Sequence, residues 1–269
     1  MSGPAATRLG VLGWPVGHSR SPAMQNAALA AAGLGDWRYQ LLPVPPELFG
    51  ELVGALAGAG LRGANVTLPH KRAALALATT PTERARAIGA ANTLTFEAND
   101  DVIADNTDAP ALIAALRTPV AGATALVLGA GGSARAAVWS LLDAGAREVT
   151  VWNRTPEHAR ALCAELGGSP AVTSAGVPGV DVLVNCTSVG LDGADPFDRL
   201  PVSAEGLDAF GCVVDFVYSD TGTALVTEAR ARGVPAIDGL ELLIGQGALS
   251  FERFTGLPAP VEAMRAAVR

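Results

Sequence analysis

A glycine-rich segment is the part of the sequence whose residue types point most directly to ligand chemistry. It reads Gly129-Ala130-Gly131-Gly132-Ser133-Ala-Arg-Ala136, a variant of G-x-G-x-x-G/A, and it follows the apolar run 124–128. Glycines let the backbone turn tightly and approach a pyrophosphate, and the helix that follows offers free N–H groups. A plain strand-to-helix turn could use the same glycines. The strand before them and the small-residue helix after them favour a nucleotide site.

The end of the next predicted strand, Val149–Trp152, indicates which nucleotide. Asn153-Arg154-Thr155 begins 24 residues after Gly129 and contains no acidic residue. An NAD site usually has Asp or Glu here for the ribose 2′-OH, whereas the 2′-phosphate of NADP needs a basic group. Arg154 could bind that phosphate and stack on adenine, with Asn153 and Thr155 donating hydrogen bonds. An ordinary solvated arginine is the alternative, but the pattern predicts NADP.

Two serines lie in a loop before a predicted helix in the first half of the chain. Ser19 and Ser21 are separated by one residue, and Pro22 starts the predicted helix Pro22–Ala32. Such a loop can direct hydroxyls and backbone N–H groups at a carboxylate. Ser21 is equally suited to be the N-cap of the helix, with Pro22 at its first position. The residues alone leave both interpretations open.

A lysine and an aspartate follow two other predicted strands. Lys71 comes just past the strand Ala64–Val66, and Asp108 precedes a helix that runs from Ala109 toward Leu116. In a cleft, desolvation and a nearby carboxylate could tune the proton affinity of Lys71. Otherwise the lysine is simply solvated and Asp108 is a helix N-cap. Spacing by itself does not pair the two side chains.

Composition excludes several other classes of protein. The 269 residues carry a net charge of −7, which argues against a broad nucleic-acid surface. Cys163, Cys186 and Cys212 form no C-x-x-C pair, and no two of the three histidines have i, i+4 spacing. We therefore expect neither a disulfide framework nor a metal site. The mean hydropathy of +0.32 raises a membrane interpretation, but glycines interrupt the longest uncharged run, Thr118–Ala134. With no secretory signal at the amino terminus, we expect a cytoplasmic protein.

Short apolar runs alternate with helical patterns along the chain, as is typical of α/β proteins with parallel sheets. A composition break at 117–122 separates the two halves. The second half has the strand–helix order of a Rossmann-type dinucleotide-binding domain. From Gly239 to Phe254, apolar residues recur at helical spacing. The expected strands are Arg8–Leu12, Tyr39–Pro43, Ala64–Val66, Leu94–Phe96, Val149–Trp152, Val182–Asn185, Cys212–Asp215 and Val234–Ile237, and the other expected first-half helix is Pro46–Ala57.

Six motifs in order, over nearly the whole chain, resemble the shikimate dehydrogenase family. The resemblance implies an N-terminal α/β substrate-binding catalytic domain over 1–118, an NADP-binding Rossmann domain over 119–238, and C-terminal helices over 239–269 that pack back on the substrate domain. The matching blocks are Gly13–Pro22, Asn65–Lys71, Ile88–Thr93, Asn106–Asp108, Gly129–Ala136 with Asn153–Thr155, and Asn185–Gly190.

The resemblance implies reversible, NADPH-dependent reduction of 3-dehydroshikimate to shikimate, a step of aromatic amino-acid biosynthesis. Lys71 would be the catalytic acid/base and Asp108 its partner. This fits the chemistry, because hydride delivery to a ketone leaves an alkoxide that needs a proton and a nearby positive charge. The implied substrate contacts are Ser19, Ser21, Thr67, Lys71, Asn92, Asp108, Tyr218 and Gln246. The implied cofactor contacts are Glu83, Gly129, Ala130, Gly131, Gly132, Ser133, Asn153, Arg154, Thr155, His158, Phe216 and Gly239.

Two kinds of alternative remain at this level. The near one is a quinate/shikimate dehydrogenase or a broad-specificity paralogue. The distant one is a non-catalytic sensor of NADP(H), against which the joint presence of Lys71, Asp108, Asn92 and Gln246 speaks. The expected partners are small molecules only, without nucleic acid or membrane, and the protein is expected to be a monomer or a homodimer.

Overall fold

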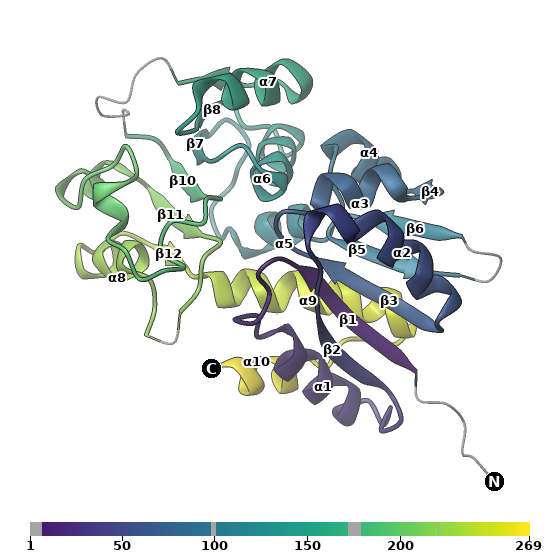
Figure 1. Ribbon diagram of the computed structural model, residues 1–269. Helices are drawn as coiled ribbons and strands as arrows, with labels where there is room; N and C mark the ends of the chain where they lie inside the picture. Colours follow the sequence, from purple (N-terminus) through teal and green to yellow (C-terminus); the bar gives the residue numbers. More distant parts are fainter. Residues whose placement is uncertain (1–6, 98–100, 172–178, 220) are drawn as a thin grey trace, which may run out of the picture. The chain divides into compact units, whose positions relative to one another are not determined.

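The chain folds as two compact units, each built on its own sheet. The computed structural model describes residues 7–97, 101–171, 179–219 and 221–269. The first unit is Met1–Thr107 together with Leu243–Arg269, and the second unit is Asp108–Leu242. The α/β fold class predicted from the sequence is confirmed, and it consists of two sheets flanked by helices (Figure 1).

The sheet of the first unit has the strand order β2-β1-β3-β5-β6-β4 over the described residues. The pairs β1–β2, β1–β3 and β4–β6 are parallel, whereas β5 runs antiparallel to both of its neighbours. The strands are β1 (Arg8–Gly13), β2 (Arg38–Pro43), β3 (Leu61–Val66), β4 (Thr80–Pro81), β5 (Thr93–Phe96) and β6 (Val102–Asp105).

Helices cover both faces of this sheet. The side chains of β3 alternate between the two faces, and those on each face are buried by helices. Ala64 and Val66 join a buried cluster with Phe49 and Val53 of α2. On the opposite face, a Cβ added at Gly63 would clash with the Phe254 ring of α9. The helices of the unit are α1 (Ser21–Ala31), α2 (Phe49–Gly58), α3 (Lys71–Leu77), α4 (Glu83–Ile88), most of α9 (Gly239–Thr255) and α10 (Val261–Val268).

Most of α9 and all of α10 belong to the first unit. Helix α10 lies beside α1 (Figure 1), and the Arg20 guanidinium donates to the Val268 carbonyl over 2.6 Å. In α9, a Cβ at Gly247 would clash with Met24, and the Gln25 amide donates to the Gly247 carbonyl over 2.9 Å. Residues near the two ends of the chain therefore share one core.

The sheet of the second unit has the order β12-β11-β10-β7-β8-β9, and every described pair in it is parallel. Numbered within the unit, this is the order 6-5-4-1-2-3 of the dinucleotide-binding fold. The strands are β7 (Thr124–Leu128), β8 (Glu148–Trp152), β9 (Ser169–Pro170), β10 (Val182–Asn185), β11 (Cys212–Asp215) and β12 (Ala236–Ile237). The helices that flank them are α5 (Asp108–Ala115), α6 (Gly132–Asp143), α7 (Pro156–Leu166) and α8 (Ala224–Ala231).

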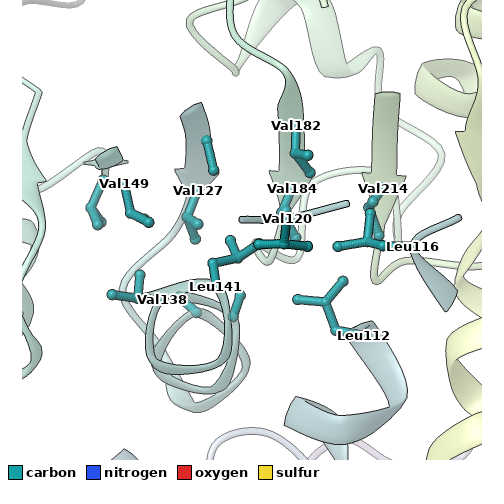
Figure 2. Close-up of a cluster of buried hydrophobic side chains, with 14 of the residues drawn as sticks. Leu112, Leu116, Val120, Val127, Val138, Leu141, Val149, Val182, Val184 and Val214 are labelled. Atoms are coloured by element: carbon teal, nitrogen blue, oxygen red, sulfur yellow. The ribbon is translucent and has the colours of Figure 1, made fainter. Parts of the chain in front are cut away.

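The core of this unit consists of valines from parallel strands packed against α5 and α6. Figure 2 shows Val127, Val184 and Val214 of three strands facing Leu141 of α6 and Leu112 of α5. Strands buried on both faces account for the high hydropathy of the chain. Because Leu112 and Leu116 belong to this core, helix α5 is part of the second unit, whereas the sequence-based boundary lies at 118.

Most expected elements are present, with differences at their ends. Strand β3 starts three residues earlier than expected, and β12 is two residues shorter. The expected helix Pro46–Ala57 opens with a 3-10 turn over Pro46–Leu48 before α2 begins at Phe49. Among the helices that the structure describes, none has the length and apolarity that a membrane crossing requires.

Candidate functional site

The glycine turn joins β7 to α6 at the carboxyl edge of the second sheet. Gly129 has a φ of 107°, and its N–H donates to the Trp152 carbonyl over 2.7 Å. A Cβ at this position would lie 3.2 Å from the Cys186 backbone, so both conformation and space require glycine. Gly131 is the N-cap of α6 with no side-chain cap bond, and a Cβ there would meet open space. A pyrophosphate fits such a turn, since the α6 amino end favours anions.

The predicted 2′-phosphate residues leave the sheet beside this turn. Leu128 and Trp152 are register partners, so Asn153 and Gly129 follow neighbouring strands at the same edge. The Asn153 side chain donates to the Thr155 carbonyl over 2.9 Å, which shapes the loop around the exposed Arg154. Thr155 is the N-cap residue of α7 but makes no side-chain cap bond, and His158 is exposed in the first turn. Glu83, another predicted cofactor contact, is an exposed residue at the start of α4 in the first unit.

A buried carboxylate organises the loops that follow β10 and β11. Asp215 is 1% exposed and accepts hydrogen bonds from the Asn185 amide (2.9 Å), the Val217 N–H (3.0 Å) and the Thr223 hydroxyl (2.7 Å). Burial raises the pKa of this carboxyl to about 6, although those three donors each lower it. The predicted residues Phe216 and Tyr218, both half-buried, flank Val217.

Gly239 approaches the same loop at the start of α9. A Cβ added there would lie 2.5 Å from the Val217 carbonyl oxygen and 2.9 Å from that of Phe216. No larger residue fits without moving the backbone. Gly239, an expected cofactor contact, is therefore a point of close packing between α9 and the loop after β11.

In the first unit, the serine loop has a different capping arrangement from the one the sequence suggested. Helix α1 begins at Ser21, the N-cap residue is Arg20, and no side chain caps it, so the N-cap interpretation of Ser21 is wrong. Ser19 Oγ instead accepts from the Ser21 N–H over 3.3 Å. Ser21 is buried and Ser19 is half-buried. The two hydroxyls thus lie at the amino end of α1.

Lys71 is the first residue of α3 and is half-buried. The loop before it is held by Thr67, whose N–H donates to the Leu12 carbonyl over 2.9 Å and whose carbonyl accepts from the His70 N–H over 3.0 Å. The His70 ring stacks on Phe49 at 4.3 Å, and its Nε2 lies 2.8 Å from the Val44 carbonyl. Burial lowers the pKa of His70, which is a packed neighbour that orients the start of α3.

Asn92 and Gln246 are brought together although 154 residues separate them. The Asn92 amide donates to the Gln246 side-chain oxygen over 3.4 Å and to the Thr107 hydroxyl over 3.0 Å. Its own oxygen accepts from the Thr107 N–H over 2.7 Å. Asn92 is buried and Gln246 half-buried, and both belong to the first unit. Two of the predicted substrate contacts therefore share one polar cluster.

A buried polar network behind Asn92 was not predicted. Ser250, one turn after Gln246, donates to the Gln246 carbonyl over 2.8 Å and accepts from the Asn65 amide over 2.7 Å. The Tyr39 hydroxyl donates to the Asn65 oxygen over 2.8 Å. Because a buried polar group without partners is costly, this network fixes α9 against β3. The sequence signal was a serine on the same helix face as Gln246.

Asp108 is the first residue of α5 and is 6% exposed. The residues before it are anchored in the first unit, where the Asn106 amide donates to the Ala90 carbonyl over 3.0 Å. Lys71 belongs to the first unit and Asp108 to the second. Within the described chain, no group of three or more His, Cys, Asp or Glu side chains could hold a metal ion.

A charge cluster at the end of β6 was also missed. The Asp105 carboxylate is buried and accepts from Arg84 Nη2 and Arg253 Nε, each over 2.6 Å, and from the Thr82 hydroxyl over 2.7 Å. Burial alone would raise its pKa, but the Thr82 hydroxyl and the two guanidiniums together hold the pKa below its ordinary value. The cluster ties α4 and α9 to the strand that leads into Asn106–Asp108.

Replacing Asp105 by Asn should destabilise the protein by about 2 kcal/mol at neutral pH. Breaking a buried ion pair costs about 3–5 kcal/mol, and water screens these arginines, which are about one third exposed. A carboxyl with a lowered folded pKa stabilises above its unfolded pKa and loses this effect as pH falls through the folded pKa. Urea unfolding should therefore show the wild-type advantage shrinking on acidification. Glu97→Gln, in an exposed pair with Arg62, is the control and should cost less than about 0.5 kcal/mol.

Three family models match most of the chain. They are described as the shikimate dehydrogenase substrate binding domain at residues 11–94, shikimate/quinate 5-dehydrogenase at 112–189, and the shikimate 5′-dehydrogenase C-terminal domain at 239–269. The first spans the serine loop, Lys71 and Asn92, the second the glycine turn and Arg154, and the third Gln246. Each of the three family models thus covers a different group of the predicted site residues.

Individual proteins match over nearly their full length. A shikimate dehydrogenase (NADP(+)) of Methylobacterium radiotolerans is 45% identical, with 95% of this chain and 93% of that protein covered. The crystal structure of shikimate 5-dehydrogenase from Thermus thermophilus with NADP(H) and shikimate has a TM-score of 0.85 and 40% identity, covering 98% of each chain. A ligand-free 5-ketofructose reductase of Gluconobacter reaches a TM-score of 0.85 at 30% identity, covering 99% of each. The motifs, the two folds and these full-length matches together establish that the chain belongs to the shikimate dehydrogenase family.

Proposed function

We propose that the chain catalyses the reversible NADPH-dependent reduction of 3-dehydroshikimate to shikimate, in the cytoplasm and as a step of aromatic amino-acid biosynthesis. The observation that carries the proposal is the full-length likeness to the Thermus thermophilus enzyme crystallised with both ligands. The first unit would bind the substrate and the second unit the cofactor, as the resemblance implies for the two halves of the chain.

The glycine turn and the loop after β8 would hold the cofactor. The open space beside Gly131 and the amino end of α6 fit a pyrophosphate, and Gly129 allows the tight turn that leads to them. The exposed Arg154 on the neighbouring loop fits the 2′-phosphate. When bound, the nicotinamide supplies or accepts the hydride. Ala130, Gly132, Ser133 and Gly239 complete the backbone that the cofactor would approach.

The first unit would orient the substrate through neutral hydrogen-bonding groups. Ser19 and Ser21 at the amino end of α1 would hold the carboxylate, where the helix dipole also favours an anion. Asn92 and Gln246, already joined to each other, would bind ring hydroxyls. A carboxylate held mainly by hydroxyls leaves Lys71 as the principal cation near the reacting oxygen.

Lys71 and Asp108 would form the acid/base pair. In the reducing direction the Lys71 ammonium donates a proton to the developing alkoxide and stabilises its negative charge before transfer. In the oxidising direction the neutral amine takes the hydroxyl proton. Asp108 would orient the lysine and maintain its charge state.

A panel of substrates and cofactors tests this proposal. Purified protein should oxidise shikimate with NADP⁺, and should use NAD⁺ poorly because no acidic residue follows β8. Quinate turnover with NADP⁺ would indicate a quinate/shikimate dehydrogenase. Reduction of 5-ketofructose, which has no carboxylate, would assign the chain to the reductase branch that the Gluconobacter protein represents. NADPH binding without turnover of any of these compounds would favour the sensor.

A further inference from the structure

The Asp215 carboxylate joins three segments of the second unit. Through Asn185 it reaches the loop after β10, because the Asn185 oxygen accepts from both the Thr187 N–H (3.1 Å) and the Thr187 hydroxyl (2.7 Å). Through the Val217 N–H it fixes the loop after β11, on which Gly239 packs. Through the Thr223 hydroxyl it holds the cap of α8, since Thr223 Oγ also accepts from the Val226 N–H over 3.3 Å.

The strand order places these segments beside the nicotinamide half of a bound dinucleotide. This step rests on the proposed function, in which the second unit binds NADP(H). In this topology the dinucleotide lies across the point where strand order reverses, here between β7 and β10. Arg154 and the glycine turn, at β8 and β7, would take the adenosine 2′-phosphate and the pyrophosphate. The nicotinamide half then extends over the carboxyl ends of β10 and β11. Thr187 and Phe216–Tyr218 follow those two ends.

A carboxylate at this position opposes stability. Asp215 is 1% exposed and burial raises its pKa to about 6, so its charged form is less favourable in the fold than in water, although the carboxyl is still mostly ionised at neutral pH. A hydrophobic residue would avoid that cost, but it could not accept hydrogen bonds from three directions. An aspartate at this position therefore costs stability but holds three loop segments in place.

We propose that Asp215 is a positioning residue for the nicotinamide half of the cofactor. It acts through Asn185–Thr187 and Val217 and does not touch the ligand itself. Losing it should loosen the nicotinamide side of the site and leave the adenosine side intact. The misplaced ring would lower the rate of hydride transfer as well as affinity.

The test compares two ligands that probe different halves of the site. Affinities for NADPH and for adenosine 2′,5′-bisphosphate are measured by titration calorimetry on wild type, Asp215→Ala and Asp215→Asn. NADPH should bind Asp215→Ala about tenfold more weakly, because binding must then order the loops that Asp215 holds in wild type, and the bisphosphate should bind within about twofold of wild type. Asp215→Asn keeps the volume and one acceptor, so it should fold even if the Ala variant does not and show a smaller shift of the same kind. In both variants kcat should fall, because a misplaced nicotinamide ring transfers hydride more slowly.

Asp181→Asn is the matched control. Asp181 precedes β10 and accepts from the Thr124 N–H (2.8 Å) and hydroxyl (2.9 Å), which ties the opposite, amino ends of β10 and β7. This variant should bind both ligands like wild type. Equal weakening of both ligands in the Asp215 variants, or no weakening of either, would overturn the proposal. If wild type binds NADPH but turns over no substrate, the proposed function is refuted, and the comparison of the two ligands still tests the role of Asp215. If wild type does not bind NADPH, the proposed function and the role of Asp215 are both refuted.

Discussion

Replacing Lys71 by Ala should lower kcat with shikimate by about 10²- to 10⁴-fold, the range that a positioned general acid/base contributes. The lysine is half-buried at the start of α3, where the packed His70 ring and the Thr67 turn fix the backbone before it. In the proposed mechanism, the variant lacks both the amine that takes the hydroxyl proton of shikimate and the positive charge that stabilises the developing alkoxide. Steady-state kinetics in the oxidising direction measures the effect.

The affinity of the Lys71 variant for NADPH should stay within about twofold of wild type, since Lys71 and the glycine turn belong to different units. Arg72→Ala is the control, because Arg72 is the next residue, is exposed, and has no assigned role. Its kcat should match wild type. Undiminished turnover in Lys71→Ala would refute the acid/base assignment and the mechanism built on it.

The second large effect concerns the choice of cofactor. Arg154→Ala should raise the KM for NADP⁺ by about 10- to 100-fold, because a charge-assisted hydrogen bond to phosphate contributes about 1.5–3 kcal/mol. The KM for NAD⁺, which lacks the 2′-phosphate, should hardly change. The ratio of kcat/KM for the two cofactors is the quantity to measure, since it cancels any general loss of activity.

Arg147→Ala provides the comparison for Arg154. Arg147 is also exposed but precedes β8, so it lies at the opposite end of the same strand. Its cofactor preference should equal that of wild type. If Arg154→Ala kept the wild-type preference, the 2′-phosphate would have to be bound elsewhere, and the identification of NADP specificity with the loop after β8 would be wrong.

The elements predicted best from the sequence are those with strong local signals. Strands β10 and β11 have the predicted bounds because each is a short apolar run that ends in a polar residue at the sheet edge, Asn185 or Asp215. The turn at Gly129 also has a strong local signal, because its positive φ favours glycine independently of tertiary contacts. The order of the motifs then predicted both folds.

The errors and omissions arise where tertiary contacts decide. Ser21 has a suitable N-cap residue type, but the turn ends one residue earlier and places it inside α1. The pairing of Asp105 with Arg253 spans 148 residues, and that of Asn65 with Ser250 spans 185. No spacing rule relates residues so far apart. A sequence contains the donors and acceptors of such networks but not their partners.

The return of the chain's end to the first unit affects the order in which the protein can fold during synthesis. Residues 108–242 contain every described strand of the second sheet, so that unit is complete before the ribosome reaches Leu243. The first unit must wait for α9 and α10, which supply Ser250 to Asn65 and cover α1. Its N-terminal half therefore emerges first but finishes last, against the usual order of domain folding. A stop codon after residue 242 should release a truncated protein whose second unit is folded and whose first unit, lacking residues 243–269, is open to proteases and chaperones.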